Sequence, residues 1–218
     1  MKIKEVLNIV ASMLNDEDKV SWTENMLLNY FNLALREMFN VRPDLFNHSI
    51  EYVCQEGYRQ IAPSDNLHFF KVFSNVNGRI CKYMPLATLN NINPKWTTNK
   101  PDEEVEIFTY DFDNPKFFYV YPPAVNGLKL NVEYSQVDKW YLDTEEDFPL
   151  PDNWVATVMD YMCYRAYQRD TEFAPNDTRI NSHLTSFQQS LQNKAQADIT
   201  NIENRTATWL GDKGQWLK

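Results

Sequence analysis

The sequence predicts an α+β protein: a helical bundle formed by N- and C-terminal helices, with an antiparallel β-rich insertion between them. Near both ends of the chain, apolar residues recur every three to four positions, which is the period of an amphipathic helix. Between about residues 47 and 150 they instead alternate with polar residues in short runs, which is the period of a strand. Asn77-Gly78 and Asn126-Gly127 separate some of these runs, and such pairs are typical of tight hairpin turns.

These changes of period set the predicted domain boundaries. The chain shows neither an internal repeat nor a linker that would divide it in another way. We expect a helical bundle core from residues 1–46 and 151–200, a β-rich insertion over residues 47–150, and a C-terminal arm over residues 201–218.

The N-terminal region predicts two helices joined by a polar turn. Residues 3–14 place apolar side chains from Ile3 to Leu14 on one face. Residues 23–41 repeat this pattern, and the second helix stops before Pro43 because proline disfavours a helix at the residue before it. Ser21 and Glu24 have the spacing of a capping box at the start of this helix.

The insertion predicts several short strands and one short helix. Residues 67–73 fit either a strand or an aromatic turn of helix, and we favour a strand. Residues 85–91 fit a short helix. The remaining strands are expected at residues 50–54, 57–62, 79–83, 105–110, 117–121 and 128–134.

The helix predicted at residues 152–170 is the centre of the bundle. Its apolar residues follow two lines rather than one, and a helix that is apolar nearly all round usually has neighbours on several sides. Asp152 can cap its first turn. Arg165 lies in the middle of this apolar surface, so we expect a structural residue paired with a carboxylate or with backbone carbonyls. A last helix is expected over residues 178–200.

Composition narrows the class of protein. The longest apolar run is far shorter than the roughly 20 residues that span a bilayer, and Glu5 and Asn8 interrupt any apolar leader, so we expect a soluble intracellular protein. Cys54, Cys81 and Cys163 lie too far apart for a zinc motif, and their odd number argues against a disulfide framework. They are expected to be buried small side chains.

The negative charge is concentrated in one region. Residues 99–150 contain twelve acidic and four basic residues, which accounts for nearly all of the net charge of −9. Because such a surface repels phosphate, tight sequence-independent binding of nucleic acid is improbable. A plain solvated face is the alternative interpretation. The most acidic positions are Asp102, Glu103, Glu104, Glu145, Glu146 and Asp147.

The sequence shows no converging catalytic constellation. Its three histidines are scattered, and no phosphate-binding glycine loop is present. Carboxylates at residues 16–18 and at Asp111 and Asp113 lie at turn boundaries, where aspartate favours the backbone geometry. We therefore expect no enzyme activity, metal or cofactor. The alternative is a carboxylate-dependent glycan hydrolase, which needs two carboxylates about 5–10 Å apart; a nucleic-acid-binding module is a third, weaker alternative.

Two Trp-Leu pairs stand out in the polar C-terminal arm. Trp209-Leu210 and Trp216-Leu217 have no local apolar segment to join. Because buried tryptophan is favoured at the centres of protein–protein interfaces, we expect these four residues to bind a partner.

The order of several segments resembles the adaptor proteins of the head–tail connector in short-tailed, podovirus-type bacteriophages. The most specific part is YDFDNPKFFYVYPP (110–123) followed by PDNWVATVMDYMCYRAYQRDTEF (151–173). The other matching segments are WTENMLLNYFNLALREMFNVRPD (22–44), GYRQIAP (57–63), GRICKYMPLATLNNINPKW (78–96) and VEYSQ (132–136). The tail after residue 200 departs from the pattern.

The resemblance implies a structural virion protein made in the host cytoplasm. Such adaptors form a ring, typically dodecameric, that links the portal protein to the tail nozzle protein in the neck, and the genome passes through the lumen without specific binding. The resemblance also implies that the C-terminal arm contacts the portal or a neighbouring subunit. The acidic positions are expected to face the lumen or the nozzle, because basic contacts would retain the passing DNA.

Overall fold

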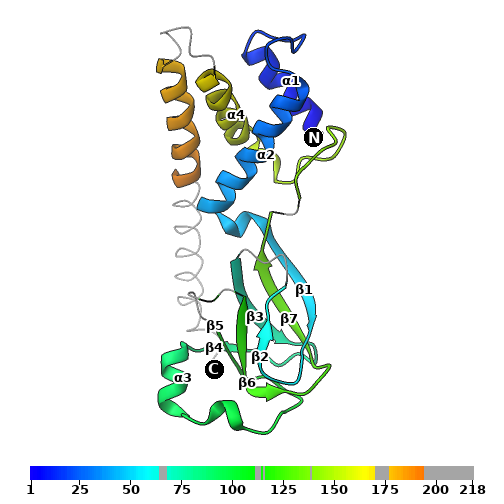
Figure 1. Cartoon of the computed structure of the whole chain (residues 1–218), viewed down its shortest axis with the longest axis vertical. Helices are drawn as coiled ribbons and strands as arrows, with labels where there is room; N and C mark the ends of the chain where they lie inside the picture. Colours follow the sequence, from blue (N-terminus) through cyan, green and yellow to red (C-terminus); the bar gives the residue numbers. More distant parts are fainter. Residues whose placement is uncertain (64–67, 111–113, 115, 138, 170–176, 194–218) are drawn as a thin grey trace, which may run out of the picture. The chain divides into compact units, whose positions relative to one another are not determined.

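The structure is a computed structural model that describes the chain except for residues 64–67, 111–113, 115, 138, 170–176 and 194–218. The chain divides into a helical unit, residues 1–42 and 139–218, and a sheet unit, residues 43–138 (Figure 1). Helices from both ends of the chain thus flank a sheet-rich insertion, and the predicted α+β class is confirmed. The division falls after residues 42 and 138, whereas the sequence predicts it after residues 46 and 150.

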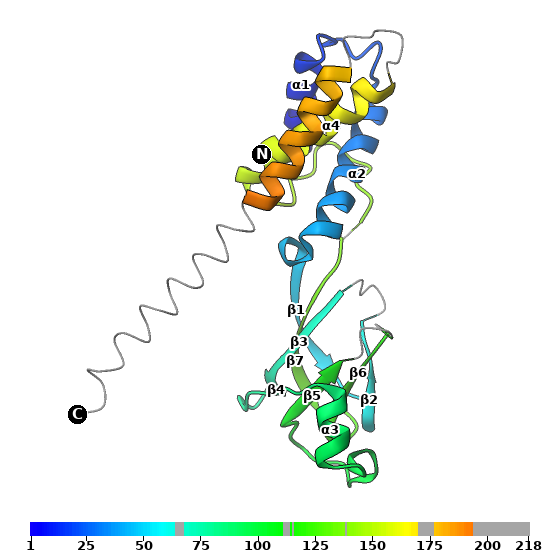
Figure 2. The ribbon, with the colours of Figure 1, turned by 90° about the vertical axis from the view of Figure 1, so that its left-hand side faces the viewer.

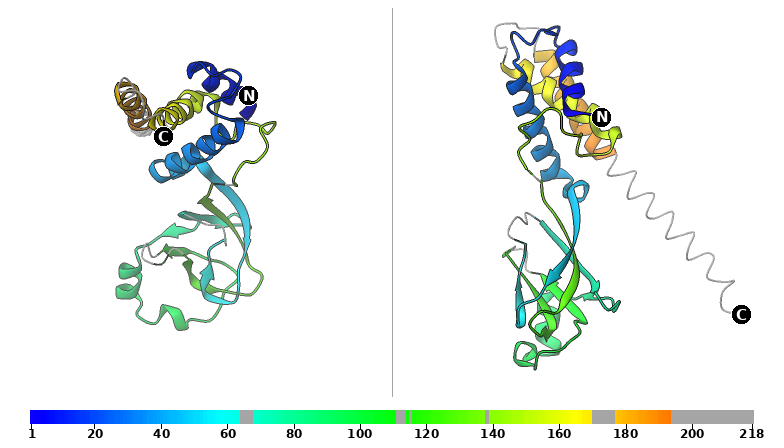
Figure 3. Two further views of the ribbon diagram at one scale, coloured as in Figure 1. Left: turned by 45° about the horizontal axis from the view of Figure 1, so that its top comes forward. Right: turned by 90° about the vertical axis from the view of Figure 1, so that its right-hand side faces the viewer.

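The helical unit contains α1 (Ile3–Met13), α2 (Glu24–Val41), α4 (Val155–Arg169) and a helix over residues 177–193. We call this last one, coloured orange in the figures, the C-terminal helix. α4 contacts both α1 and α2 and lies between α1 and the C-terminal helix (Figure 3). The predicted amphipathic faces of α1 and α2 are buried, from Ile3 to Val10 and from Leu27 to Met38.

α4 has the central position that its sequence predicts. Eight of its side chains are buried, and they point in several directions around the helix axis, as expected for a helix covered on several sides. Its start differs from the prediction. A single turn of 3-10 helix, η3 (Asp152–Trp154), precedes it with Pro151 at the N-cap, and no side chain caps that turn.

The capping box expected at the start of α2 is not formed. Thr23 occupies the N-cap position and no side chain caps the helix there. Instead, the Asp16 carboxylate accepts hydrogen bonds from the backbone N–H groups of Val20, Ser21 and Trp22, at 2.8–3.0 Å. These bonds, led by that from Trp22, lower the pKa of Asp16. The polar turn is therefore organised by Asp16 rather than by Ser21.

The sheet unit contains two sheets. The first has the strand order β1 (Asn47–Val53), β7 (Lys129–Ser135), β3 (His68–Asn75). The second has the order β2 (Gly57–Ile61), β6 (Phe117–Ala124), β5 (Ile107–Tyr110), β4 (Lys82–Tyr83) (Figure 2). The shorter elements are η1 (Pro43–Phe46), α3 (Leu86–Ile92) and η2 (Trp96–Thr98).

Strand pairing in the sheet unit is antiparallel, as predicted, with one exception. β4 pairs with β5 in parallel, Lys82 with Ile107 and Tyr83 with Phe108. The strand expected at residues 79–83 is thus shorter. The turn at Asn77-Gly78 still reverses the chain, because Ser74 forms an antiparallel bridge with Ile80. Segment 67–73, for which a strand was favoured, largely coincides with β3.

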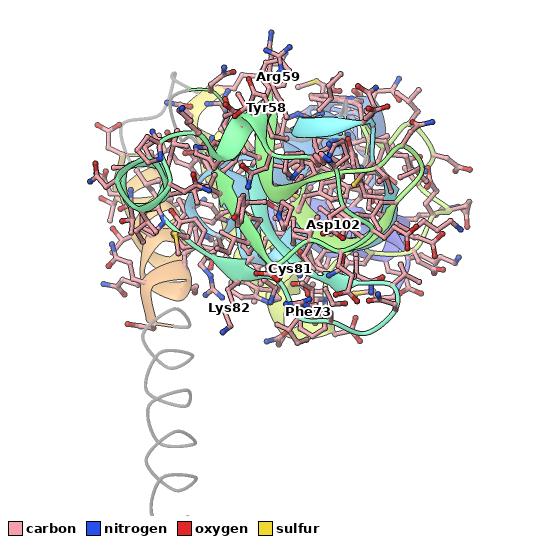
Figure 4. All side chains as sticks on the ribbon, turned by 90° about the horizontal axis from the view of Figure 1, so that it is seen from below. Tyr58, Arg59, Phe73, Cys81, Lys82 and Asp102 are labelled. Atoms are coloured by element: carbon pink, nitrogen blue, oxygen red, sulfur yellow. The ribbon has the colours of Figure 1, made fainter. Side chains whose placement is uncertain are left out.

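The core of the sheet unit is formed by side chains from the strands of both sheets. The regular register of β1 against β7, from Asn47–Ser135 to Val53–Lys129, directs alternate side chains inward. Phe118, Val120, Leu130 and Val132 form the centre of this core and are fully buried. Cys81 lies among the strands, whereas the side chains of Lys82 and Arg59 reach outward (Figure 4).

Candidate interaction surfaces

A groove of about 490 Å³ lies in the helical unit, and its lining comes from α2, α4 and the C-terminal helix. Its deepest lining residues are Tyr161, Phe187 and Leu191, which are 8%, 3% and 2% exposed. The rings of Tyr161 and Phe187 lie 5.1 Å apart and are tilted by 56°. The groove therefore has an aromatic and aliphatic floor.

The rim of this groove carries charged and polar side chains. Arg165 and Glu37 lie on it, together with exposed Gln188. Burial raises the pKa of Tyr161 above its ordinary value; the Arg165 guanidinium opposes this rise and the Glu37 carboxylate adds to it. Both charges therefore act on the aromatic floor.

The partner of Arg165 differs from the one expected. Its Nη1 donates a hydrogen bond to Oε1 of Gln168, one turn along the same helix, at 3.2 Å. Within the described part of the chain, neither a carboxylate nor a backbone carbonyl holds this guanidinium. Arg165 is half-buried and lies at the groove, so its structural role stays a prediction.

A stack of side chains holds the C-terminal helix against α4 beside the groove. Nδ1 of His183 lies 2.9 Å from Oδ1 of Asp160 on α4. The His183 ring stacks on Tyr167 with centroids 5.8 Å apart and planes 16° apart, and the Arg179 guanidinium lies 5.5 Å from the centre of the Tyr167 ring. These contacts set the position of one wall of the groove.

The acidic residues at 145–147 each bind a lysine. Lys4 pairs with Glu145 at 2.8 Å, Lys2 with Asp147 at 2.9 Å, and Lys139 with Glu146. The hydrogen bond and charge of Lys2 lower the pKa of Asp147. Backbone hydrogen bonds run alongside, from N–H of residue 3 to the carbonyl of residue 146 and from N–H of residue 148 to that of residue 1. This acidic segment fastens the start of α1.

The acidic residues at 102–104 lie in the sheet unit. Glu104 accepts hydrogen bonds from Nη1 of Arg79 at 2.5 Å and from Nδ2 of Asn77 at 2.8 Å, and these bonds lower its pKa. Asp102 and Glu103 are exposed, and neither forms an ion pair with another described residue. Asp102 is labelled in Figure 4, which shows the molecule from below.

The two acidic clusters therefore differ in electrostatic character. The contacts of Lys2 and Lys4 could not be inferred from local sequence, because both lysines are more than 140 positions away from their partners. Asp102 and Glu103 keep uncompensated charge, whereas the carboxylates at 145–147 are largely neutralised.

Several residues that were considered for catalysis have structural roles instead. Asp16 orders a turn, as shown above, and His48 stacks on Tyr134 with centroids 5.7 Å apart. Asp111 and Asp113 lie outside the described residues. Among the residues that the structure covers, no group of three or more His, Cys, Asp or Glu side chains could hold a metal ion. In the same part of the chain, no helix has the length and hydrophobicity needed to cross a bilayer.

The predicted partner-binding residues Trp209, Leu210, Trp216 and Leu217 lie outside the described residues. Their role stays a prediction. The groove was not predicted from the sequence, because one of its walls comes from α2, which lies more than 100 positions before the other two helices.

Comparison with known families gives a match over nearly the whole chain. The model of the family described as SU10 adaptor protein matches residues 1–211. This range includes the sheet unit, the helical unit except residues 212–218, and the first Trp-Leu pair of the arm. No curated protein matches the chain.

Proposed function

Because the chain belongs to the SU10 adaptor protein family, a family of phage adaptors, we propose that it forms the adaptor ring of a phage head–tail connector. The ring, typically dodecameric, links the portal protein to the tail nozzle protein, and the genome passes through its lumen. The family match over residues 1–211 is the observation that carries this proposal. The protein is then a structural component of the virion neck, without enzyme activity, made in the host cytoplasm.

The architecture is compatible with a ring subunit. The helical unit and the sheet unit each have their own core, so each can present a separate surface to a different partner. Asp16 and His48, two of the side chains considered for catalysis, serve a turn and an aromatic stack. Both observations favour assembly over catalysis as the role of this chain.

The charge distribution supports a lumen that DNA can pass. Asp102 and Glu103 carry exposed charge that no described cation balances, so a surface bearing them would repel phosphate. We place these two residues toward the lumen or the nozzle. Glu104, which is bound to Arg79, and Glu145, Glu146 and Asp147, which are bound to lysines, contribute less to such a field.

The C-terminal arm supplies the proposed contact with other subunits. Tryptophan and leucine side chains on a polar segment bury large apolar area when they enter a pocket on another chain. We place Trp209, Leu210, Trp216 and Leu217 against the portal or a neighbouring adaptor subunit.

The test is co-purification of the tagged chain with the portal and nozzle proteins encoded in the same genome, followed by negative-stain microscopy. The proposal expects capture of both partners and a ring at the portal vertex. A monomer in solution remains compatible with the proposal if the ring forms when portal is added. A chain that captures neither partner, and forms no ring on portal, would contradict it.

A further inference from the structure

We propose that the groove between α2, α4 and the C-terminal helix receives the Trp-Leu arm of a second copy of this chain. The inference rests on the proposed function and deepens it, because it names both sides of a contact between neighbouring subunits. The groove lies wholly within the helical unit, so its shape does not depend on how the two units are placed.

The chemistry of the groove matches an indole ring. Its floor offers the aromatic faces and edges of Tyr161 and Phe187, which favour tilted or edge-to-face contact with another aromatic ring. The guanidinium of Arg165 can lie over an indole face, where a cation is attracted by the ring electrons. Glu37 and Gln188 supply oxygens at the rim, which can accept the hydrogen bond that a buried indole N–H requires.

The groove also offers apolar surface for the leucine that follows each tryptophan. Val41 lines it and is 54% exposed, and Leu184 on the facing helix is half-buried. A volume of about 490 Å³ is well above the roughly 300 Å³ at which ligand pockets begin. The groove thus has an aromatic part for the ring and an aliphatic part for its neighbour, in keeping with the composition of Trp209-Leu210 and Trp216-Leu217.

Residues 194–200 connect the arm to the C-terminal helix, which forms one wall of this groove. The sequence from Lys194 to Leu210 contains neither glycine nor proline, the residues that most strongly mark a reversal of the chain. This composition argues against a return of Trp209-Leu210 to the groove of its own chain. It favours the groove of a neighbouring copy as the receiving site.

A contact of this kind joins two different surfaces, the arm of one subunit and the groove of the next. Such head-to-tail contacts propagate around a ring when the rotation between subunits closes. The groove and the arm together would therefore supply one link that repeats at every subunit boundary of the proposed ring.

A binding measurement tests the groove. The receptor is the full chain with Trp209→Ala and Trp216→Ala, so that its own arm does not compete, and the probe is a fluorescent peptide of residues 203–218. We expect saturable binding that Val41→Asp weakens at least tenfold, since loss of an interface anchor commonly has that size. Val20→Asp is the matched control, because Val20 is 78% exposed and does not line the groove.

Both valines are well exposed, so both variants are expected to keep the melting temperature of the parent chain. Tyr164→Ala serves as a second groove variant, because Tyr164 lines the groove and is half-buried. Absence of saturable binding, or equal weakening by Val41→Asp and Val20→Asp, would overturn the assignment of the groove.

Cross-linking tests the source of the arm. A chain with Val41→Cys is mixed with a chain carrying Leu210→Cys under mild oxidation, at a concentration at which the peptide binds. The native Cys54, Cys81 and Cys163 are buried and should stay out of the reaction. We expect a disulfide between the two chains, and far less of it when Val20→Cys replaces Val41→Cys. A chain that carries both Val41→Cys and Leu210→Cys is the comparison. If the disulfide forms only within that chain, and not between the two singly substituted chains, the second copy is overturned as the source of the arm.

The failure of this inference and that of the proposed function can be told apart. A full chain that captures portal and nozzle while the peptide does not bind would overturn the groove and leave the function standing. Peptide binding and an interchain link without capture of portal or nozzle would support the groove and contradict the function.

Discussion

The side-chain amide of Asn32 on α2 forms hydrogen bonds with both the backbone N–H and the backbone carbonyl of Tyr141. The Asn32 Oδ1 accepts a hydrogen bond from the Tyr141 N–H at 2.7 Å, and its Nδ2 donates to the Tyr141 carbonyl at 2.9 Å. The same Nδ2 also donates to the Leu28 carbonyl one turn earlier in α2. Asn32 has no exposed surface, so these bonds are made away from water, where an unpaired backbone group is costly. The pair fixes the segment that follows residue 138 to the helical unit.

The first prediction concerns this pair. Asn32→Ala leaves the N–H and the carbonyl of Tyr141 without their buried partner and should lower the free energy of unfolding by about 2–4 kcal/mol. Asn29→Ala on the exposed side of α2 is the matched control and should change it by less than about 0.5 kcal/mol. Urea denaturation followed by circular dichroism measures both, and equal effects of the two substitutions would contradict the assigned role.

The second prediction concerns the buried thiols. Burial raises the pKa of Cys54 to about 12, that of Cys81 to about 11 and that of Cys163 to about 12. Each thiol therefore stays protonated in the folded chain at pH 8, and the thiolate is the reactive form. We expect iodoacetamide to label none of them at pH 8 until denaturant unfolds the chain, as mass spectrometry would show. An introduced Val20→Cys is the control and should be labelled rapidly, since Val20 is 78% exposed.

The same pKa shifts determine whether the free energy of unfolding rises or falls with pH. The unfolded chain loses these protons from about pH 9, whereas the folded chain keeps them up to pH 11 to 12. The stabilisation is complete below pH 9 and is lost as pH rises toward those values, by about 1.4 kcal/mol per pH unit for each thiol. Cys163→Ala should therefore flatten the decline of the free energy of unfolding between pH 9 and 11. An unchanged slope would contradict the burial of this thiol.

The third prediction concerns the exposed acidic pair of the sheet unit. Asp102→Lys with Glu103→Lys should slow genome release from assembled particles, because lysines in the lumen would bind the passing phosphates. Assembly should be intact, since neither carboxylate forms an ion pair with a described residue. DNA release triggered in vitro and followed with an intercalating dye measures the rate. Glu56→Lys, at another exposed position of the sheet unit, is the control. Normal release by the double variant would favour the plain solvated-face interpretation.

Charge reversal at Glu145, Glu146 and Asp147 is expected to act differently. These carboxylates bind lysines beside the start of α1, so reversal replaces attraction by repulsion there. Because the pairs are solvent-exposed, we expect only a small loss of stability, with little change in the rate of genome release.

Much of the fold could be predicted from the sequence, because periodicity reports burial directly. The 3.6-residue period of α1 and α2 marks the faces that are buried, and the nearly uniform apolar character of α4 marks its central position. The alternation along β7 likewise follows its buried residues, from Leu130 to Tyr134.

What the sequence could not show depends on contacts between distant residues. The segment over residues 139–150 looks like part of the insertion, yet it is held by Asn32 and by the Phe31 ring, which lies 5.8 Å from that of Tyr141. The two-residue strand β4 pairs in parallel with β5, whereas strands that are joined by a hairpin pair antiparallel. The lysine partners of the acidic clusters and the three-sided groove have the same origin in tertiary structure.

The fourth prediction compares two arginines of the helical unit. Arg165 donates to an amide and is half-buried, so Arg165→Ala should lower the free energy of unfolding by less than about 1 kcal/mol, well below the 3 kcal/mol typical of a broken buried pair. Arg42 is 8% exposed and its guanidinium lies 5.6 Å from the centre of the Trp154 ring, so Arg42→Ala should cost about 2 kcal/mol. Thermal denaturation of both variants checks the order. A larger loss for Arg165→Ala would restore the buried-pair hypothesis.

The last prediction concerns the C-terminal arm. Deleting residues 201–218 should leave the helical unit folded, because the described contacts between the C-terminal helix and α4 come from His183 and Phe187, well before the arm. The deletion should nevertheless weaken association with the assembled connector at least tenfold, since it removes both Trp-Leu pairs. Quantitative pull-down with portal measures this, and Trp209→Ala with Trp216→Ala should reproduce most of the loss. Asn204→Ala with Thr206→Ala, which changes the same arm and leaves its apolar anchors in place, is the control.

We also expect hydrogen exchange in residues 201–218 to slow on assembly, because amides at a buried interface exchange only when it opens. A truncated chain that joins the portal with unchanged affinity would exclude the portal as the surface that receives the arm, and would leave a neighbouring subunit as the only proposed partner.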